Sequence, residues 1–421
     1  MNRIRPRPQP HLLLLAVALL LPVIGRAQPN PPPPVDPVLQ RILALGKRNC
    51  AMEHLDYVTN HIGPRLTGSR RAVESVEWAV ETFKSWGLEA TMDLAGTVPV
   101  RFERGPWQGK MVEPEEMAFE FGTPSWSAGT RGKERGPAIL APATADGVEA
   151  IRDQVQGAWV LLPPPPPPGA AVDRGEQQRQ QQRDAMLRQR LIEAGARGFI
   201  SRATNPIRLL GRWPNSWEER PRHPDIRLVD RYYDLVKARL ERGERVVLEF
   251  DIRNYLTPGP APFYNALGWF KGTELPDELV IFGGHFDSYC SATGTIDNAV
   301  GAITALEAAH LLARAGFRPR RTILFALWGG EEQGLLGSRS WIERNRDRLA
   351  KISAYFNHDT GTNAIVGVSG TEAMAADLRQ ALGPINLLDP SRPFEVRTVP
   401  TLGSGRGGSD HAAFLRAGVP G

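Results

Sequence analysis

The second half of the sequence alternates short, continuously apolar runs with longer amphipathic runs. Three of the apolar runs, at 279–282, 323–328 and 352–356, have the length of buried β-strands. The amphipathic runs between them, "DNAVGAITALEAAHLLARAG" and "LLGSRSWIERNRDRLAK", are typical of helices. Strands that are apolar on both faces and alternate with helices belong to sheets that helices cover on both sides. The sequence therefore predicts an α/β fold with a mostly parallel sheet sandwiched by helices.

Each of these three predicted strands ends in acids or histidines with glycine close by. The carboxyl ends of parallel strands meet at one edge of a sheet, where open α/β folds bind their ligands. One acid at a strand end is usually a solvated loop residue, but three successive strand ends with this chemistry indicate a shared crevice. The candidate residues are His285 and Asp287 in "GGHFDS", Glu331 and Glu332 in "GGEEQG", His358 and Asp359 in "NHDTG", Asp297 in "GTIDNAVG", and Asp410 and His411 in "GGSDHAAF".

This set of residue types favours a metal site. Carboxylates gathered in one crevice repel one another unless cations neutralise them. Imidazole and carboxylate ligands together suit zinc or a related divalent ion. Glu331 and Glu332 are neighbours in the chain, so they point in different directions and we expect them to do different jobs. Strand alternation turns His358 away from Asp359, so we expect it to be structural.

The motifs "GGHFDS", "IDNAVG", "WGGEEQGLLGS", "NHDTG" and "GGSDHAAF", in this order, resemble those of the M28 metallopeptidases. This family includes di-zinc aminopeptidases and glutamate carboxypeptidases. The segment "HIGPRLTGSR" resembles the N-terminal segment of the same family. The resemblance covers most of the chain after residue 45. It implies a zinc-dependent exopeptidase that hydrolyses short peptides or dipeptides.

The resemblance also implies a role for each motif residue. Asp297 would bridge two zinc ions, and Glu331 would be the general base for a water that the two ions activate. Asp287 would accept the second ring N–H of His285 and so fix its tautomer. The ligand sets it implies are His285, Asp297 and Asp359 for one zinc ion, and Asp297, Glu332 and His411 for the other.

The first 27 residues have the pattern of a secretory signal peptide. Three early arginines precede an apolar stretch at 12–24, and Gly25 and Ala27 form a small-x-small cleavage pattern. An uncleaved membrane anchor is the alternative. Cleavage predicts a secreted or periplasmic protein without stable membrane insertion. It also removes four arginines, which changes the formal net charge from +5 to +1 (+5 − 4), so no nucleic-acid partner is indicated.

The remaining chain divides into four predicted segments. A proline-rich linker at 28–40 precedes the N-terminal part of the catalytic domain at 41–110. Residues 111–244 are predicted to be an α+β insert, placed where the family carries a protease-associated (PA) domain. The metal-binding part follows at 245–421. In the family at least one more strand and helix follow the last histidine, so the resemblance indicates that the chain is incomplete or that its pocket differs.

Several alternatives stay open at the level of sequence. A catalytically inactive, receptor-like relative and a single-zinc glutaminyl cyclase share this fold, although the complete ligand set favours a peptidase. The sequence does not distinguish an aminopeptidase, a carboxypeptidase and a dipeptidase, or a monomer and a homodimer. Cys50 and Cys290 could form one disulfide or remain two thiols.

Overall fold

The computed structural model describes residues 36–164, 173–204, 207, 209–387, 390–403 and 408–421. The predicted signal peptide and most of the proline-rich linker lie outside these residues, as does most of the proline run at 163–168. Among the described residues, no helix combines the length and the apolar character that crossing a bilayer demands.

The described strands vary widely in length, and two of them are far longer than the rest. The strands are β1 (Glu89–Glu113), β2 (Met117–Ala118), β3 (Phe121–Gly122), β4 (Glu134–Leu140), β5 (Trp159–Leu161), β6 (Gly198–Ala203), β7 (Asp225–Val229), β8 (Val247–Phe270), β9 (Leu275–His285), β10 (Arg321–Trp328), β11 (Ile352–Asn357), β12 (Gly367–Gly370) and β13 (Glu395–Thr398).

Helices occupy most of the connections between these strands. The α-helices are α1 (Pro37–Gly46), α2 (Ala51–Asp56), α3 (Arg70–Ser85), α4 (Arg152–Val155), α5 (Arg174–Glu193), α6 (Asp230–Glu241), α7 (Val300–Arg314), α8 (Leu336–Arg344), α9 (Glu372–Leu382) and α10 (His411–Arg416). Two π-helical turns, η1 (Tyr57–Ile62) and η3 (Thr295–Ala299), and three 3₁₀ turns, η2 (Ala145–Ile151), η4 (Arg346–Lys351) and η5 (Gly383–Leu387), complete the set.

Eleven of the described strands form one sheet, in the order β11–β9–β10–β8–β4–β5–β6–β7–β3, with β1 paired to β8 and β2 to β1. The three strands predicted from the sequence are parallel neighbours, since β9 pairs in parallel with both β10 and β11. The long strands β1 and β8 are antiparallel to each other, and β8 is antiparallel to β10. The predicted α/β class and the parallel order of these three strands are confirmed, and the antiparallel pair makes the sheet mixed.

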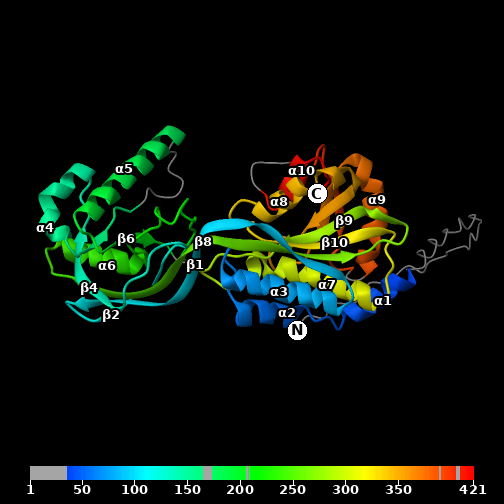
Figure 1. Cartoon of the computed structure of the whole chain (residues 1–421), viewed down its shortest axis with the longest axis horizontal. Coiled ribbons are helices and arrows are strands. Elements are labelled where there is room, and N and C mark those ends of the chain that lie inside the picture. The colour runs from blue at the N-terminus through cyan, green and yellow to red at the C-terminus, as the bar shows by residue number, and fades with distance from the viewer. Residues whose placement is uncertain (1–35, 165–172, 205–206, 208, 388–389, 404–407) are drawn as a thin grey trace, which may run out of the picture. The chain divides into compact units, whose positions relative to one another are not determined.

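Each face of the β8–β11 part of the sheet carries its own hydrophobic core, because alternate residues of a strand point to opposite faces. On β10, Phe325 and Leu327 pack with α3 and α7, where Phe83 and Leu306 are fully buried. Residues of the opposite face pack with Trp341 of α8 and with α10. Figure 1 shows α3 and α7 on one side of the sheet and α8 and α10 on the other.

The predicted insert packs around two hydrophobic cores, one of which it shares with β8. Strands β4, β5, β6 and β7 are parallel neighbours, with α5 and α6 among their connections. One core surrounds Trp159 and Phe250, and the other surrounds Leu191 and Phe199. The segment joins the rest of the sheet through the β1–β8 pair and through β4, which pairs with β8. Its likeness to a PA domain stays a prediction.

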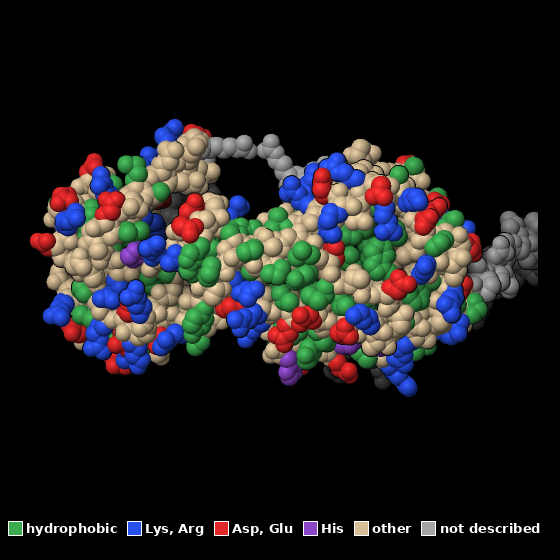
Figure 2. Space-filling model, in the orientation of Figure 1, with side chains coloured by type: hydrophobic (Ala, Val, Ile, Leu, Met, Phe, Trp, Pro, Cys, Tyr) green, Lys and Arg blue, Asp and Glu red, His purple; other side chains and the backbone are tan. Residues whose placement is uncertain are grey.

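The surface carries both signs of charge. On the face shown in Figure 2, Lys and Arg side chains are interspersed with Asp and Glu side chains over both halves of the view. This face therefore has no extended field of one sign. The absence of a nucleic-acid partner stays a prediction.

We expect Phe83→Ala to destabilise the fold strongly. The Phe83 ring is fully buried, and its centroid lies 6.3 Å from that of Phe325. Removing a buried phenylalanine ring typically costs about 3–5 kcal/mol of the free energy of unfolding. Urea denaturation measures the change, with Phe356→Ala as the control because Phe356 is 37% exposed. Equal losses in the two variants would contradict the core described above.

Candidate metal centre and active site

The carboxyl ends of β9, β10 and β11 lie together at one edge of the sheet. In the parallel register, His285 pairs with Trp328 of β10, and Gly283 pairs with Asn357 of β11. The residues that follow these strands therefore emerge side by side. Sequence motifs separated by dozens of residues are brought to one place in this way.

His285 is the last residue of β9 and lies between two carboxylates. Its side chain is 1% exposed, and its Nε2 is 3.0 Å from Asp297 Oδ1 and 3.5 Å from Asp359 Oδ1. Among the described residues, these three form the one group of at least three potential metal ligands whose atoms lie within 4.8 Å of one another. One imidazole nitrogen and two carboxylate oxygens suit zinc, and three protein ligands leave a coordination position open.

Asp297 is held by the turn that precedes α7. Its backbone departs from helical geometry, with φ −126° and ψ 94°, inside the η3 turn. The next residue, Asn298, fixes this turn because its side chain donates to the His358 carbonyl and accepts the Gly301 N–H. The Asp297 side chain is 67% exposed, in contrast to the buried His285 ring. The His285 side of the group is therefore buried in the core, and the Asp297 side is open to solvent.

The charge state of this group in the metal-free chain follows from its partners. Burial alone would lower the pKa of His285, but the nearby carboxylates of Asp287, Asp297 and Asp359 raise it well above its usual 6.5. The chain without metal thus keeps a positive charge between the carboxylates as an imidazolium. A metal ion would replace that proton, since a histidine ligand must be neutral.

Glu331 and Glu332 lie beside this group in a pocket rich in carboxyl groups. Burial raises the pKa of each glutamate to about 8, and neighbouring carboxylates, Asp287 above all, add to the shift. The pKa of Asp410 is raised to about 7, mainly by burial, and neither of its carboxylate oxygens has a hydrogen-bond partner. So many buried carboxyl groups fit a site that holds additional positive charge, which is the chemistry of a divalent cation.

The second predicted ligand set is not gathered as the first one is. The described group of potential metal ligands contains neither Glu332 nor His411. His411 begins α10, and burial lowers the pKa of its ring. Residues 404–407, which precede this helix, lie outside the described part of the chain. The second ligand set stays a prediction.

The comparisons with known proteins fit this geometry. The family model described as "Peptidase family M28" matches residues 265–421, which include every candidate metal ligand. These residues form an M28 peptidase domain. The match bears out the prediction of a metallopeptidase of this family, and it leaves the role of each residue to be tested.

Curated relatives and solved structures extend the likeness over most of the chain. Carboxypeptidase Q of Mus musculus is 24% identical over 382 residues, covering 89% of this chain and 77% of that protein. The human carboxypeptidase Q is 23% identical over 383 residues, covering 89% and 76%. A peptidase M28 precursor from Shewanella amazonensis has a TM-score of 0.61 at 20% identity, covering 91% and 85%. A zinc aminopeptidase from Bacillus subtilis has a TM-score of 0.56 at 19% identity, covering 88% and 82%.

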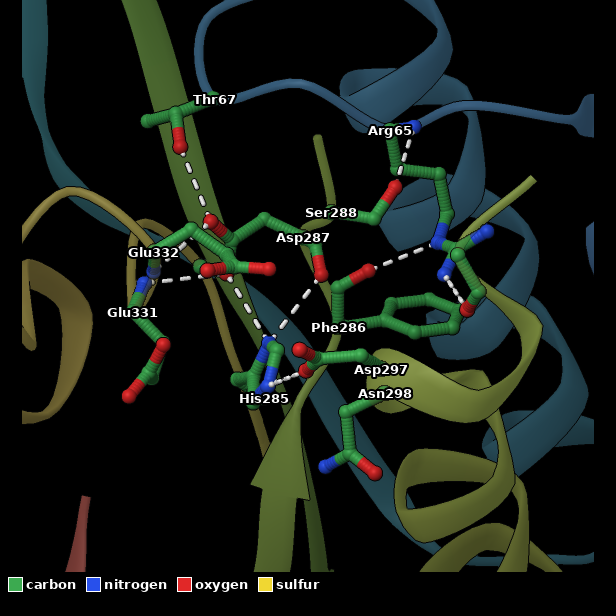
Figure 3. Close-up of polar contacts among 12 residues, drawn as sticks. Arg65, Thr67, His285, Phe286, Asp287, Ser288, Asp297, Asn298, Glu331 and Glu332 are labelled. Carbon is green, nitrogen blue, oxygen red and sulfur yellow. Dashed lines mark hydrogen bonds and ion pairs between the residues drawn. The ribbon is translucent and has the colours of Figure 1, made fainter. Parts of the chain in front are cut away.

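Asp287 has more partners in the M28 site than the sequence predicted. The predicted contact is long, because its Oδ1 lies 3.6 Å from His285 Nδ1, whereas its main-chain carbonyl lies 3.1 Å from that nitrogen. The carboxylate instead accepts the N–H of Glu331 at 3.0 Å and that of Glu332 at 3.4 Å. Asp287 therefore orients His285 mainly through its backbone and holds the two glutamates through its side chain (Figure 3).

Three further residues contact the M28 site. The sequence predicts no role for Arg65 and Thr67, and for Tyr289 it predicts only a place in the lining of a substrate pocket, because Tyr289 follows the "GGHFDS" motif. Arg65 and Thr67 belong to the "HIGPRLTGSR" segment, and both contact the residues that follow β9. The Tyr289 hydroxyl donates to the Glu332 carbonyl at 3.0 Å. Burial and then Glu332 raise the pKa of Tyr289 to about 12, so this hydroxyl stays a donor. The position of Arg65 and Thr67 in a motif, and of Tyr289 directly after one, was visible in the sequence, but their partners were not.

A cavity of about 400 Å³ opens beside the metal group. Its lining includes Tyr289, Thr293, Ile296, Asp297 and Glu332. Ile296 is 61% exposed and supplies an apolar side chain to this lining. A cavity with apolar walls next to polar, reactive groups is the usual form of a small-ligand site.

The remaining candidates lie outside this arrangement. The His358 ring is buried with neither nitrogen hydrogen-bonded, and it is not part of the metal group. His310 stacks on Trp86 and contacts Glu307, which is a packing role. Cys50 and Cys290 are both free, so of the two open alternatives for the cysteines the structure has the unbonded one.

We expect the metal-free protein to lose stability as the pH rises from about 5 to about 8. The pKa values of Glu331 and Glu332 are about 8 in the folded chain against a usual 4.5, so the folded chain binds more protons than the unfolded chain in this window. Stability then falls as the pH rises. Thermal unfolding of chelator-treated protein at several pH values measures this slope. Glu331→Gln should make the slope shallower, and a stability that rises with pH would refute the electrostatic account.

Proposed function

We propose that the chain is an exported, zinc-dependent exopeptidase that hydrolyses short peptides or dipeptides. The observation that carries this proposal is the placement of the His285–Asp297–Asp359 group beside two buried glutamates in an M28 domain. The signal-like residues 1–27 support export to the periplasm or the exterior. The printed names of its relatives, carboxypeptidase Q and zinc aminopeptidase, support zinc and a peptide substrate.

We assign the predicted ligands as follows. His285, Asp297 and Asp359 would hold one zinc ion, and Asp297, Glu332 and His411 would hold a second, with Asp297 shared. Zinc bound there would polarise the peptide carbonyl and lower the pKa of a water molecule. Asp287 would keep the His285 ring in the required orientation through the carbonyl that lies 3.1 Å from Nδ1.

Glu331 is proposed as the general base. Its carboxylate would take a proton from the attacking water and pass it to the amine of the leaving group. Burial has already raised its pKa to about 8, which places the proton affinity of the metal-free group near neutral pH. The hydrogen bond from the Glu331 main-chain N–H to Asp287 fixes the backbone position from which the Glu331 side chain extends.

One observation favours a single-zinc alternative. The described residues gather one complete ligand group and leave Glu332 and His411 out of it. A single-zinc glutaminyl cyclase would need no more than this. The metal content of the purified protein separates the two functions, because the exopeptidase proposed here needs about two zinc ions per chain.

We expect the two adjacent glutamates to respond differently to amidation. Glu331→Gln should keep both metals and lose about 10²–10⁴-fold in turnover, the range that general-base catalysis contributes. Glu332→Gln should lose metal instead, because it removes a charged ligand. Elemental analysis and steady-state kinetics on both variants measure this. Metal loss in Glu331→Gln with full retention in Glu332→Gln would reverse the assignment.

We expect hydrolysis of short peptides with a free terminus. The cavity beside Asp297 and Glu332 has a volume of about 400 Å³, which suits one or two residues and not a folded polypeptide. A free dipeptide, its N-acetyl form and its C-amide form the test panel. Loss on acetylation alone indicates an aminopeptidase, loss on amidation alone a carboxypeptidase, and loss on both a dipeptidase. Efficient internal cleavage of a long, doubly blocked peptide would exclude the exopeptidase.

A further inference from the structure

Arg65 is a buried arginine whose four acceptors are neutral main-chain carbonyls. Its side chain is fully buried in the turn that follows η1. Nε donates to the Phe286 carbonyl at 2.7 Å, and Nη2 donates to the Gly294 carbonyl at 2.9 Å. Nη1 donates to the carbonyls of Thr293 and Gly63 at 2.9 and 3.0 Å. One guanidinium therefore joins both ends of the loop 286–294.

This loop connects two residues of the candidate metal group. Phe286 directly follows His285, and Gly294 lies three residues before Asp297. Arg65 thus binds the chain immediately after one ligand and shortly before the other. Figure 3 shows the guanidinium against the loop, on the side away from the face where His285 and Asp297 meet. The guanidinium therefore bonds the loop close to both ligands.

Burying an arginine at position 65 costs more free energy than a purely structural contact would require. Burial lowers its pKa to about 10, and Asp287 offsets part of that shift. Burying an arginine without a directly bonded carboxylate costs free energy. Neutral side chains could pack a loop at lower cost. The planar fork of an arginine, however, can bind several carbonyls at fixed distances, which no other side chain can do.

The same segment reaches the other half of the site through Thr67. The Thr67 hydroxyl donates to Asp287 Oδ2 at 3.0 Å. That carboxylate accepts the N–H groups of Glu331 and Glu332 at 3.0 and 3.4 Å. Thr67 is therefore linked to the backbone of both glutamates by two hydrogen bonds through the Asp287 carboxylate, while Arg65 bonds the residue next to His285.

We propose that Arg65 and Thr67 are positioning residues with separate targets: Arg65 sets the zinc affinity of the His285–Asp297–Asp359 group, and Thr67 sets the placement of Glu331. The proposal rests on the metal site and the general base proposed above. Groups that orient metal ligands without touching the metal typically change metal affinity or activity by about 10–100-fold. Substitution of Arg65 should then change mainly the zinc affinity, and substitution of Thr67 mainly the turnover.

The experiment compares Arg65→Lys and Thr67→Val in the full chain. Lysine keeps the charge but cannot bind the carbonyls at both ends of the loop, and valine keeps the shape of threonine without its hydroxyl. Arg101→Lys is the matched control, because Arg101 bonds the carbonyl of Gly68 at 3.2 Å in the same segment. Zinc affinity is measured by competition with a chromogenic chelator, and kcat and KM are measured on a dipeptide at limiting and at excess zinc.

We expect Arg65→Lys to bind zinc about 10–100-fold more weakly and to regain most of its kcat in excess zinc. Thr67→Val should keep the zinc ion of the His285–Asp297–Asp359 group and lose about 10-fold or more in kcat at unchanged KM, with no rescue by zinc. Arg101→Lys should change neither quantity. General destabilisation of the fold would not produce this crossed pattern, and thermal unfolding midpoints of the zinc-loaded variants check for it.

Normal zinc affinity in a folded Arg65→Lys variant, or loss of the zinc ion of the His285–Asp297–Asp359 group in Thr67→Val, would overturn the proposal. If Arg65→Lys does not fold, Gly294→Ala carries the same test. Gly294 has φ +64°, and a methyl group there would lie 2.3 Å from Ser288 Cβ and 3.0 Å from Arg65 Nη2, so the loop must shift away from the guanidinium. Absence of zinc binding in the unmodified protein would refute the proposed function itself, which is a distinguishable result.

Discussion

The parallel register of β9 against β10 and β11 determines where every acidic residue of the site lies. His285 pairs with Trp328, and the chain beyond each strand turns toward the same edge. A shift of one residue would reverse which face of the sheet each side chain occupies. The two hydrophobic cores oppose such a shift, because Phe325 and Trp328 would exchange their buried environments. Packing far from the metal group therefore fixes its geometry.

The site holds several buried carboxyl groups close together, an arrangement that serves the chemistry of the site at the expense of folding stability. Glu331, Glu332 and Asp410 are buried close to one another, and their pKa values rise to about 8, 8 and 7. Without a cation these groups hold protons, and the imidazolium of His285 supplies one positive charge. Strain of this kind concentrates at functional sites, since groups arranged for reactivity are not arranged for stability. The metal-free and metal-loaded chains should thus differ in protonation as well as in stability.

The sequence predicted the parts of the structure that local pattern encodes. The apolar runs at 279–282, 323–328 and 352–356 lie within β9, β10 and β11, and the residues after them meet at one edge. It did not predict the β1–β8 pair, because "PVRFERGPWQGK" has no regular alternation of apolar and polar residues. The role of Arg65 could not be read either, since its partners are carbonyls, which every residue has. The carboxylate contacts of Asp287 depend on tertiary folding in the same way.

The length of the β1–β8 pair has a mechanical consequence for the insert. These strands of 25 and 24 residues pair from the M28 sheet into the insert as one hydrogen-bonded ribbon (Figure 1). A two-stranded ribbon resists bending within its plane, where hydrogen bonds would have to break, far more than a linker of irregular chain does. The regular pairing of the ribbon is interrupted at four register shifts, between Leu94 and Gly96, Val98 and Val100, Arg104 and Trp107, and Met111 and Glu113. The predicted insert is therefore attached to the M28 sheet by a continuous strand pair and not by a linker, and bending of the ribbon should concentrate at these four irregular positions.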